Sequence, residues 1–316
     1  GGPPSGDEGF YGARSLFFNK VGFVDAGELA IYPKLVSFVF NYDINHVLAL
    51  RVIDMIIAFI AGAFFFLYSQ KIHKDKFLVF WIVLSGLLIM NNFAFIYNGF
   101  SNSIHFAYVF LFLALLISSF EKNENNYRVY VSGLLVGASV LIRETFVLYA
   151  LAFTLIMFIF SDRKNVVFFI FGGLTSLFFA VSLTVITGES AESLINAYSG
   201  KAKFYSFLRS EYSNFNAFRG FLARSWQFIL FLLFAFFIAK NCRPKVSDQV
   251  SVKMYLVFTI LAFAPWLEPV LKYSVAYTFA LCMPGLVFLT LTALNGFELS
   301  FKKHLHLFFA TFLIFV

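Results

Sequence analysis

Long, uninterrupted apolar runs recur along the whole chain, and this pattern limits the fold more than any other feature. The runs are continuous rather than alternating with a period of two, so they indicate helices and not the strands of a barrel. Several are shorter than the ~20 residues that a perpendicular membrane span needs, so we expect some helices to meet in pairs as shallow V shapes. The runs are 47–69, 77–92, 101–119, 129–142, 145–160, 166–187, 225–239, 254–267 and 274–295, with a shorter one from 305.

The composition agrees with a membrane protein. Hydrophobic residues make up 60% of the 316 residues, charged residues only 13%, and the mean hydropathy is +0.81. A soluble domain cannot bury so much apolar surface, whereas lipid serves as solvent for the outer faces of helices. The sequence therefore predicts an all-α integral membrane protein, a polytopic helix bundle of about ten or more spans. We expect residues 1–46 to form a first extracytoplasmic loop and residues 47–316 a transmembrane bundle, with interfacial helices in an outer loop at 188–224.

The charged residues are distributed unevenly between the two sets of alternate loops. Loops 71–76, 121–128, 162–164, 240–253 and 298–303 carry 13 Lys and Arg against 6 Asp and Glu, whereas the loops of the other side carry 10 of each. Such an excess marks the cytoplasmic side of a membrane protein. It also accounts for the net charge of +7 without nucleic-acid binding. The other face, which includes Asp7, Arg143 and Lys272, is then extracytoplasmic.

Motifs of soluble enzymes and of metal sites are missing from the sequence. Cys242 and Cys282 lie in different segments without the spacing of metal ligands, so we expect neither a disulfide nor a metal site from them. There is no Walker loop, no HExxH, no GxSxG and no GxGxxG. The candidate functional residues are polar ones in the loops and within the apolar runs.

The two long extracytoplasmic loops contain the first group of such residues. The first loop carries the adjacent carboxylates Asp7 and Glu8, which are either a catalytic pair or a hydrated acidic loop. The second, 188–224, mixes Lys201, Lys203 and other basic residues with many aromatics. That mixture is typical of a helix in the headgroup layer, which either contacts anionic phosphate or only anchors the loop.

Ionisable residues inside the apolar runs form the second group. Arg143-Glu144 interrupts the run Val131–Phe160, as expected where two short helices meet at the outer surface; Arg143 then either faces a pocket or forms a local ion pair. Four other residues also have structural explanations. Arg51 and Asp54 are spaced to pair on one helix face, His105 is expected to pack between helices, and Lys272 beside Tyr273 is either an interface anchor or a phosphate ligand.

In order along the chain, these elements resemble the GT-C superfamily of polytopic glycosyltransferases, and most closely its protein O-mannosyltransferase and lipid A aminoarabinose transferase branch. The resemblance extends from Asp7 to about Leu291 in short motifs, but two positions depart from it: the next outer loop, 98–105, has no carboxylate, and lysine replaces arginine at 272. The matching elements are Asp7-Glu8-Gly9-Phe10-Tyr11, Tyr32-Pro33-Lys34-Leu35, Ala49-Leu50-Arg51, the glycine-rich 133–137, Leu141-Ile142-Arg143-Glu144, and Lys272-Tyr273 followed by Pro284.

The resemblance implies inverting transfer of a sugar from a polyprenyl-phosphate donor to an extracytoplasmic acceptor, which is a glycan, a lipid or a protein. It implies Asp7 as the base and Glu8 as its partner, and these two would be the ligands if a divalent metal ion is bound. The donor phosphate would contact Lys272, Arg143 and Tyr273, with Lys201 and Lys203 in reserve. No cofactor is otherwise expected.

Two other functions remain open on the sequence: a transporter or flippase of lipid-linked sugars, and a polysaccharide polymerase or ligase. A transporter often shows inverted repeats, and none is visible here. Frequent Phe, Asn and Lys and the lack of an Asn-x-Ser/Thr sequon favour a bacterial inner-membrane protein of the cell envelope. Because no apolar run precedes Asp7 and the last run is short, we expect a fragment that lacks further spans at both ends.

Overall fold

The computed structural model describes residues 31–98, 103–118, 120, 124–186, 249–267 and 276–295, with a few single positions elsewhere. Within these ranges the chain is helical and contains no strand. The helices are α2 (Ile31–Val36), α3 (His46–Ile72), α4 (Lys76–Asn98), α5 (Ser103–Ile117), α6 (Asn126–Ile142), α7 (Val147–Phe160), α8 (Arg163–Ile186), α12 (Gln249–Phe263) and α14 (Ala276–Leu294), with short 3-10 turns η1 (Ser37–Asn41), η2 (Glu144–Phe146) and η3 (Ala264–Leu267).

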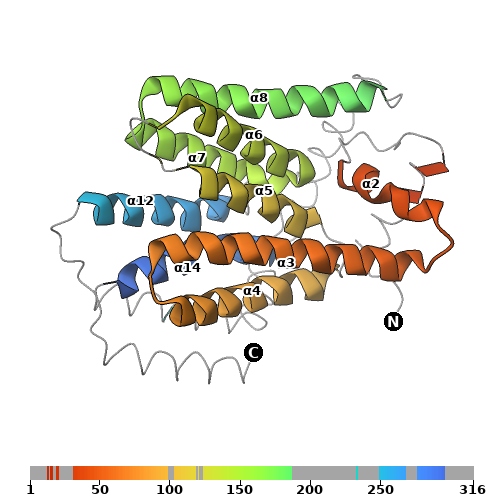
Figure 1. Ribbon diagram of the computed structural model, residues 1–316, viewed down its shortest axis with the longest axis horizontal. Helices are drawn as coiled ribbons and strands as arrows, with labels where there is room; N and C mark the ends of the chain where they lie inside the picture. Colours follow the sequence, from red (N-terminus) through yellow and green to blue (C-terminus); the bar gives the residue numbers. More distant parts are fainter. Residues whose placement is uncertain are drawn as a thin grey trace, which may run out of the picture.

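The long helices lie side by side, each running roughly along or against its neighbours (Figure 1). Helix α5 occupies a central place, since it packs on α3 on one side and on α6 on the other. Beyond α6 lies α8, and beyond α3 lie α4 and α14. Helix α12 packs on both α14 and α7, and α7 in turn on α8. The short helix α2 sits at the end of the bundle where α3 begins (Figure 1).

Polar residues just outside the apolar runs determine where several helices begin. The side chain of Asn45 accepts a hydrogen bond from the Leu48 amide at 3.1 Å, and Asn125 accepts one from Tyr127 at 2.9 Å. Asp75 accepts from the amides of Phe77 and Leu78, both at 3.1 Å. Each bond satisfies an amide that the first helical turn leaves without a partner. These caps explain why α3, α4 and α6 start beside their apolar runs rather than within them.

The end of the bundle where α3 and α5 finish is held together by polar contacts, and we call it the basic end. There the Lys71 ammonium donates to the carbonyl of Leu116 at 2.8 Å, and Asn295 donates to the carbonyl of Ile72 at 2.8 Å. Lys253 donates to the carbonyl of Phe120. These bonds satisfy carbonyls at or beyond helix C-termini, where cations are also favoured by the helix dipole. The basic end carries Lys71, Lys74, Lys76, Arg128, Arg163, Lys164 and Lys253.

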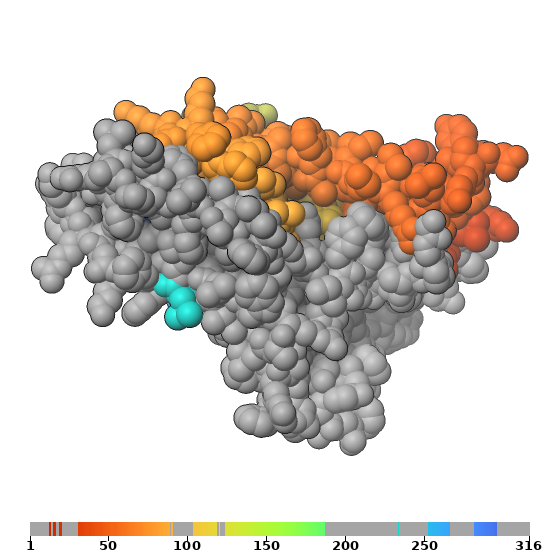
Figure 2. Space-filling model, turned by 90° about the horizontal axis from the view of Figure 1, so that it is seen from below, coloured from red at the N-terminus to blue at the C-terminus, as the bar shows by residue number. Residues whose placement is uncertain are grey.

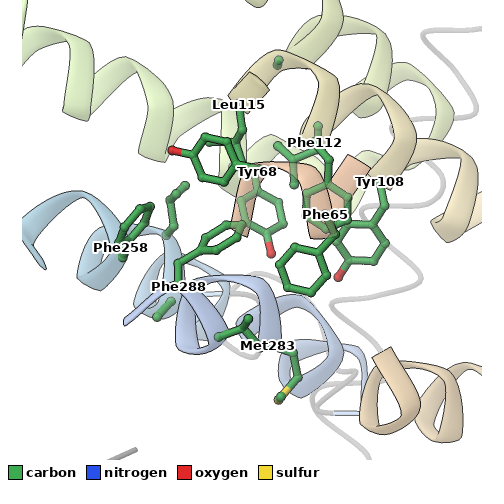
Figure 3. Packing of buried hydrophobic residues seen from close by; sticks show 14 of the residues in the cluster. Phe65, Tyr68, Tyr108, Phe112, Leu115, Phe258, Met283 and Phe288 are labelled. Atoms are coloured by element: carbon green, nitrogen blue, oxygen red, sulfur yellow. The ribbon is translucent and has the colours of Figure 1, made fainter. Parts of the chain in front are cut away.

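Aromatic side chains fill the core between α3, α5, α12 and α14. Figure 3 shows Phe65, Tyr108 and Phe112 gathered together, with Phe288 and Phe258 further along. Phe65 stacks on Phe112 with ring centroids 4.7 Å apart, and Phe112 stacks on Tyr108 at 5.2 Å. All five rings are almost completely buried. Packing of this kind fixes the spacing of the helices, because close-packed interiors tolerate little change in volume.

The expected all-α class is confirmed for the described residues, and the eight long helices follow the expected runs closely. The break at Arg143 is also where we expected it, between α6 and α7. Two helices, α3 and α8, are long and apolar enough to cross a membrane, while the other apolar helices are shorter where they are described. The full set of about ten spans thus stays a prediction. The runs 225–239 and 305–316 and the loop 188–224 lie outside the described ranges, apart from Leu233.

Candidate functional sites at the end opposite the basic end

Arg143 is the one expected site residue within the described part of the chain. Asp7, Glu8, Lys201, Lys203, Lys272 and Tyr273 all lie outside it, so their roles stay predictions. Arg143 directly follows α6, whose last residue, Ile142, packs against a cluster from α2 and the start of α3. These elements lie at the end of the bundle opposite the basic end (Figure 1).

The chain turns sharply at Arg143 because one helix ends and another begins within five residues. Arg143 has an extended backbone (φ −142°, ψ 108°), and its amide closes α6 by donating to the Ser139 carbonyl at 3.0 Å. Its own carbonyl accepts from the amide of Phe146 at 2.9 Å, which forms the single turn η2. Phe146 is completely buried and packs edge-on against Tyr108 at 4.9 Å. The buried phenylalanine therefore anchors the turn, and Arg143 stays half-buried at the end of the bundle.

Helix α2 packs directly beside this turn. Tyr32 is 1% exposed and lies in a small apolar cluster with Val36, Val39 and Leu50, against which Ile142 and Phe106 also pack. Ile142 is the residue that immediately precedes Arg143. Lys34 is buried too, and its ammonium donates to the Thr184 hydroxyl near the end of α8, at 3.5 Å. Helix α2, which follows the first loop, therefore packs against the ends of α5, α6 and α8.

A small apolar groove of about 270 Å³ opens between these elements. Its walls come from α2, α5, α6 and α8, and we call it the α2–α6 groove. Nearly all of its lining is aliphatic or aromatic, so it suits a hydrocarbon chain rather than a polar ligand. The lining residues are Ile31, Leu35, Phe106, Phe110, Leu134, Ala138, Leu141, Ile142, Ser176, Phe179, Ala180 and Leu183.

On the other side of α5, a carboxylate and an imidazole meet inside the apolar part of the bundle. Nδ1 of His105 lies 3.2 Å and 3.1 Å from the two carboxylate oxygens of Asp54. Asp54 is 1% exposed and His105 14% exposed by side chain. A histidine that donates to a carboxylate carries a proton on the donating nitrogen, here Nδ1, and the bond fixes the orientation of its ring. His105 is therefore not only a packing residue, because it pairs with a buried carboxylate.

The Asp54–His105 pair lines a larger groove of about 580 Å³ between α3, α4 and α5, which we call the α3–α4 groove. Figure 2 shows α3 along one edge of the molecule with α4 beside it. Tyr108 and Phe112 form part of its lining and also belong to the aromatic core, so this side of the groove is firmly supported. The remaining walls are apolar: Met55, Ala58, Phe59, Ala61, Gly62, Ala63, Phe66, Phe80, Val83, Leu84, Leu87, Leu88 and Met90.

The Asp54–His105 pair was not predicted from the sequence, because the two residues are 51 positions apart. Spacing along the sequence indicates only local neighbours, such as Arg51 one helical turn from Asp54. The one available signal was that both residues fall early in runs expected to start from the same face of the membrane. No group of three or more His, Cys, Asp or Glu side chains suited to a metal ion occurs among the described residues. Because Asp7 and Glu8 lie outside that part, a metal site there is untested.

Comparisons of the chain with protein-family models, with curated proteins and with solved structures found no match.

Proposed function

We propose that this chain is a polytopic membrane glycosyltransferase of the bacterial inner membrane, which transfers a sugar from a polyprenyl-phosphate donor to an extracytoplasmic acceptor. The proposal starts from the order of GT-C-like motifs in the sequence. One observation carries it further: α2, which continues the loop bearing Asp7 and Glu8, packs against Ile142, next to Arg143. Helix α2 therefore lies at the end of the bundle where the cation expected to meet the donor phosphate is found, and the proposal puts Asp7 and Glu8 near the same end.

Large exposed apolar side chains support a location in lipid. Phe59 of α3 is 78% exposed, Phe158 of α7 69% and Phe178 of α8 69%. Along α8 the exposed positions Ile170, Phe171, Leu174 and Phe178 recur at helical spacing, so one face of this helix is apolar and uncovered. Contiguous apolar surface of this kind marks contact with a membrane or a partner. The basic end would face the cytoplasm and Arg143 the outside.

The proposed reaction needs few groups. The acceptor hydroxyl oxygen attacks the anomeric carbon of the sugar while the bond from that carbon to the phosphate oxygen breaks with inversion. Asp7 takes the hydroxyl proton, and the electron pair of the broken bond leaves on the polyprenyl phosphate. Arg143 and Lys272 stabilise the negative charge on that phosphate. Glu8 orients Asp7 or the acceptor, and the α2–α6 groove takes part of the prenyl chain.

The test is transfer of labelled sugar from polyprenyl-phosphate donors by membranes that contain the full-length protein. We expect Asp7→Asn to abolish transfer and Arg143→Gln to reduce it by at least about tenfold, as loss of a charge-stabilising group does. Asp43→Asn is the matched control, because Asp43 is an exposed carboxylate of the same outer loop. Transfer that survives Asp7→Asn at the level of the control would rule out Asp7 as the base.

A transporter or flippase of lipid-linked sugars is the second candidate, and the Asp54–His105 pair favours it. Ionisable residues within an apolar helix are costly, and they often mark an ion, proton or substrate pathway. If the protein is a transporter, Asp54→Asn should abolish translocation of the lipid-linked sugar in proteoliposomes, whereas Asp7→Asn should have little effect. The opposite pattern favours the transferase.

A further inference from the structure

We propose that the α3–α4 groove is a binding site for a single-chain lipid with an uncharged hydroxyl head group, which the Asp54–His105 pair holds by hydrogen bonds. The proposal rests on the membrane location given above but not on the sugar-transfer reaction. It explains a feature that the proposed reaction does not use, namely a buried ionisable pair at the edge of an open apolar groove.

The shape and lining of the groove suit a hydrocarbon chain. Its volume of about 580 Å³ falls within the range of ~300–1,000 Å³ that is typical of sites for small organic ligands. The walls from α3 and α4 are apolar along several helical turns, from Met55 to Phe66 and from Phe80 to Met90. Met55 and Phe59 are 58% and 78% exposed, so the groove opens on the surface that would face lipid. A chain can therefore enter from the bilayer without crossing the core.

The polar end of the groove determines the head group. Asp54 and His105 lie in the part of α3 and α5 closest to the Arg143 end, so a bound lipid would place its head there and its chain toward Phe66. No Lys or Arg lies among the described residues that line the groove. A phosphate or carboxylate head group would thus lie close to the Asp54 carboxylate, and the lining holds no lysine or arginine whose positive charge would offset the repulsion. A hydroxyl group can donate its proton to the Asp54 carboxylate or to Nε2 of His105, which is an acceptor when Nδ1 carries the proton, so it meets the pair without bringing a charge.

The chemistry of the head group is shared by several lipids, such as a free polyprenol or a long-chain alcohol. The probe in the first experiment is therefore synthetic. It is an alcohol of about sixteen carbons that carries a photoreactive diazirine in its chain, which is short enough to lie within the ~30 Å bilayer core. Acid and alkyl-phosphate probes of the same length, with the diazirine at the same carbon, serve for comparison. The purified full-length protein in lipid nanodiscs is irradiated with each probe, and the labelled peptides are identified by mass spectrometry.

We expect the alcohol to label peptides from α3 and α4 roughly fivefold more than the acid or the phosphate, the factor that one ordinary hydrogen bond contributes. Ala58→Trp should block this labelling, because Ala58 lies in the groove wall. Ile56→Trp is the matched control, since Ile56 is an exposed residue of the same helix that does not line the groove. Asp54→Leu combined with His105→Phe should remove the preference for the alcohol while keeping the fold.

Equal labelling by the three probes, or stronger labelling by the phosphate, would overturn the proposal. Equal loss of labelling in Ala58→Trp and Ile56→Trp would do so as well, because the chain would then bind elsewhere. Labelling is measured without any sugar donor. A protein that transfers no sugar can still show the selective labelling, and an active transferase can fail to show it, so the two proposals are tested separately.

Discussion

The α6–α8 interface and the α3–α4 groove are built in opposite ways. Between α6 and α8 the backbones nearly touch: a Cβ added at Gly133 would lie 2.0 Å from the carbonyl oxygen of Phe169, and one added at Gly172 would lie 2.1 Å from that of Tyr130. Hydroxyl groups join the same helices, since Ser176 donates to the carbonyl of Leu134 at 2.6 Å. Between α3 and α4, by contrast, an open groove of about 580 Å³ remains.

The difference indicates that the two regions have different tasks. Small residues let helices approach closely, and the close approach adds van der Waals contact and hydrogen bonds that do not depend on excluding water. An open groove gives up such contacts along its walls. The pair α6 and α8 therefore acts as a frame, whereas the groove on the other side of α5 is the region that can accept a ligand. The experiments below are ordered from the largest expected effect to the smallest.

A bulky residue at Gly133 should have the largest effect. In Gly133→Val the side chain would overlap the backbone of α8, so the helices must separate, and we expect a loss of stability above about 3 kcal/mol or no folded protein. Gly173→Ala is the matched control, because a Cβ at Gly173 meets its nearest atom at 3.7 Å, an ordinary contact. Thermal unfolding in detergent, followed by size-exclusion chromatography, measures both. Equal behaviour of the two variants would contradict the close-packed frame.

Removal of one partner of the buried pair should have the next largest effect. In His105→Phe the Asp54 carboxylate stays buried but loses its imidazole partner, and we expect a loss of about 3–5 kcal/mol. Replacing both partners, with Asp54→Leu and His105→Phe together, should restore most of that loss because the buried carboxylate is then removed along with the imidazole. A double variant as unstable as the single one would mean that the pair does not act as a unit.

Loss of the Ser176 hydroxyl should lower the stability of the α6–α8 interface less than a substitution at Gly133 or His105. Ser176→Ala removes the hydrogen bond to the Leu134 carbonyl and leaves the close packing intact. Interhelical hydrogen bonds in membrane proteins contribute about 0.6–1.7 kcal/mol, so we expect a loss of stability in that range. Thr154→Ala provides the control, because the Thr154 hydroxyl bonds within its own helix, to the Ala150 carbonyl. A larger loss in the control than in Ser176→Ala would argue against the interhelical bond.

A bulky residue in the α3–α4 groove should have the smallest effect. Ala58→Trp has room in the open groove, so we expect a change in stability within about 0.5 kcal/mol, as at a position without special constraint. The same substitution at Ala114, which is completely buried in the core, should be strongly destabilising. If both variants unfold alike, the groove is not open space in the folded protein.

The helices could be predicted from the sequence, since continuous apolar runs separated by charged loops leave little choice of structure. The break at Arg143 was also predicted, because two charges interrupt an apolar run there. By contrast, the glycines of α8 that meet Gly133 and Gly137 were not predicted, nor was the short helix α2. Both depend on which helices become neighbours. Spacing along one helix does not contain that information.

The candidate sites could be predicted only in part for the same reason. Arg143 was identified from its own unusual position, whereas the link between Asp54 and His105 joins two helices through a tertiary contact. Asp54 has Arg51 one helical turn away in sequence, which made a local pair the simplest interpretation. The groove itself has no sequence signal, because its walls are made of the same apolar residues as the core.

The most direct test concerns orientation: both proposals require a bundle that crosses the membrane, and the transferase also requires the Arg143 end outside and the basic end inside. Single cysteines at the exposed positions Asp43, Lys74 and Asp162, in a variant without Cys242 and Cys282, would be treated with a membrane-impermeant maleimide in intact spheroplasts. We expect Asp43→Cys to react at once, and Lys74→Cys and Asp162→Cys only after the membrane is opened. Immediate reaction of all three would contradict the membrane-spanning bundle on which both proposals depend, and the reverse pattern would contradict the proposed transferase site.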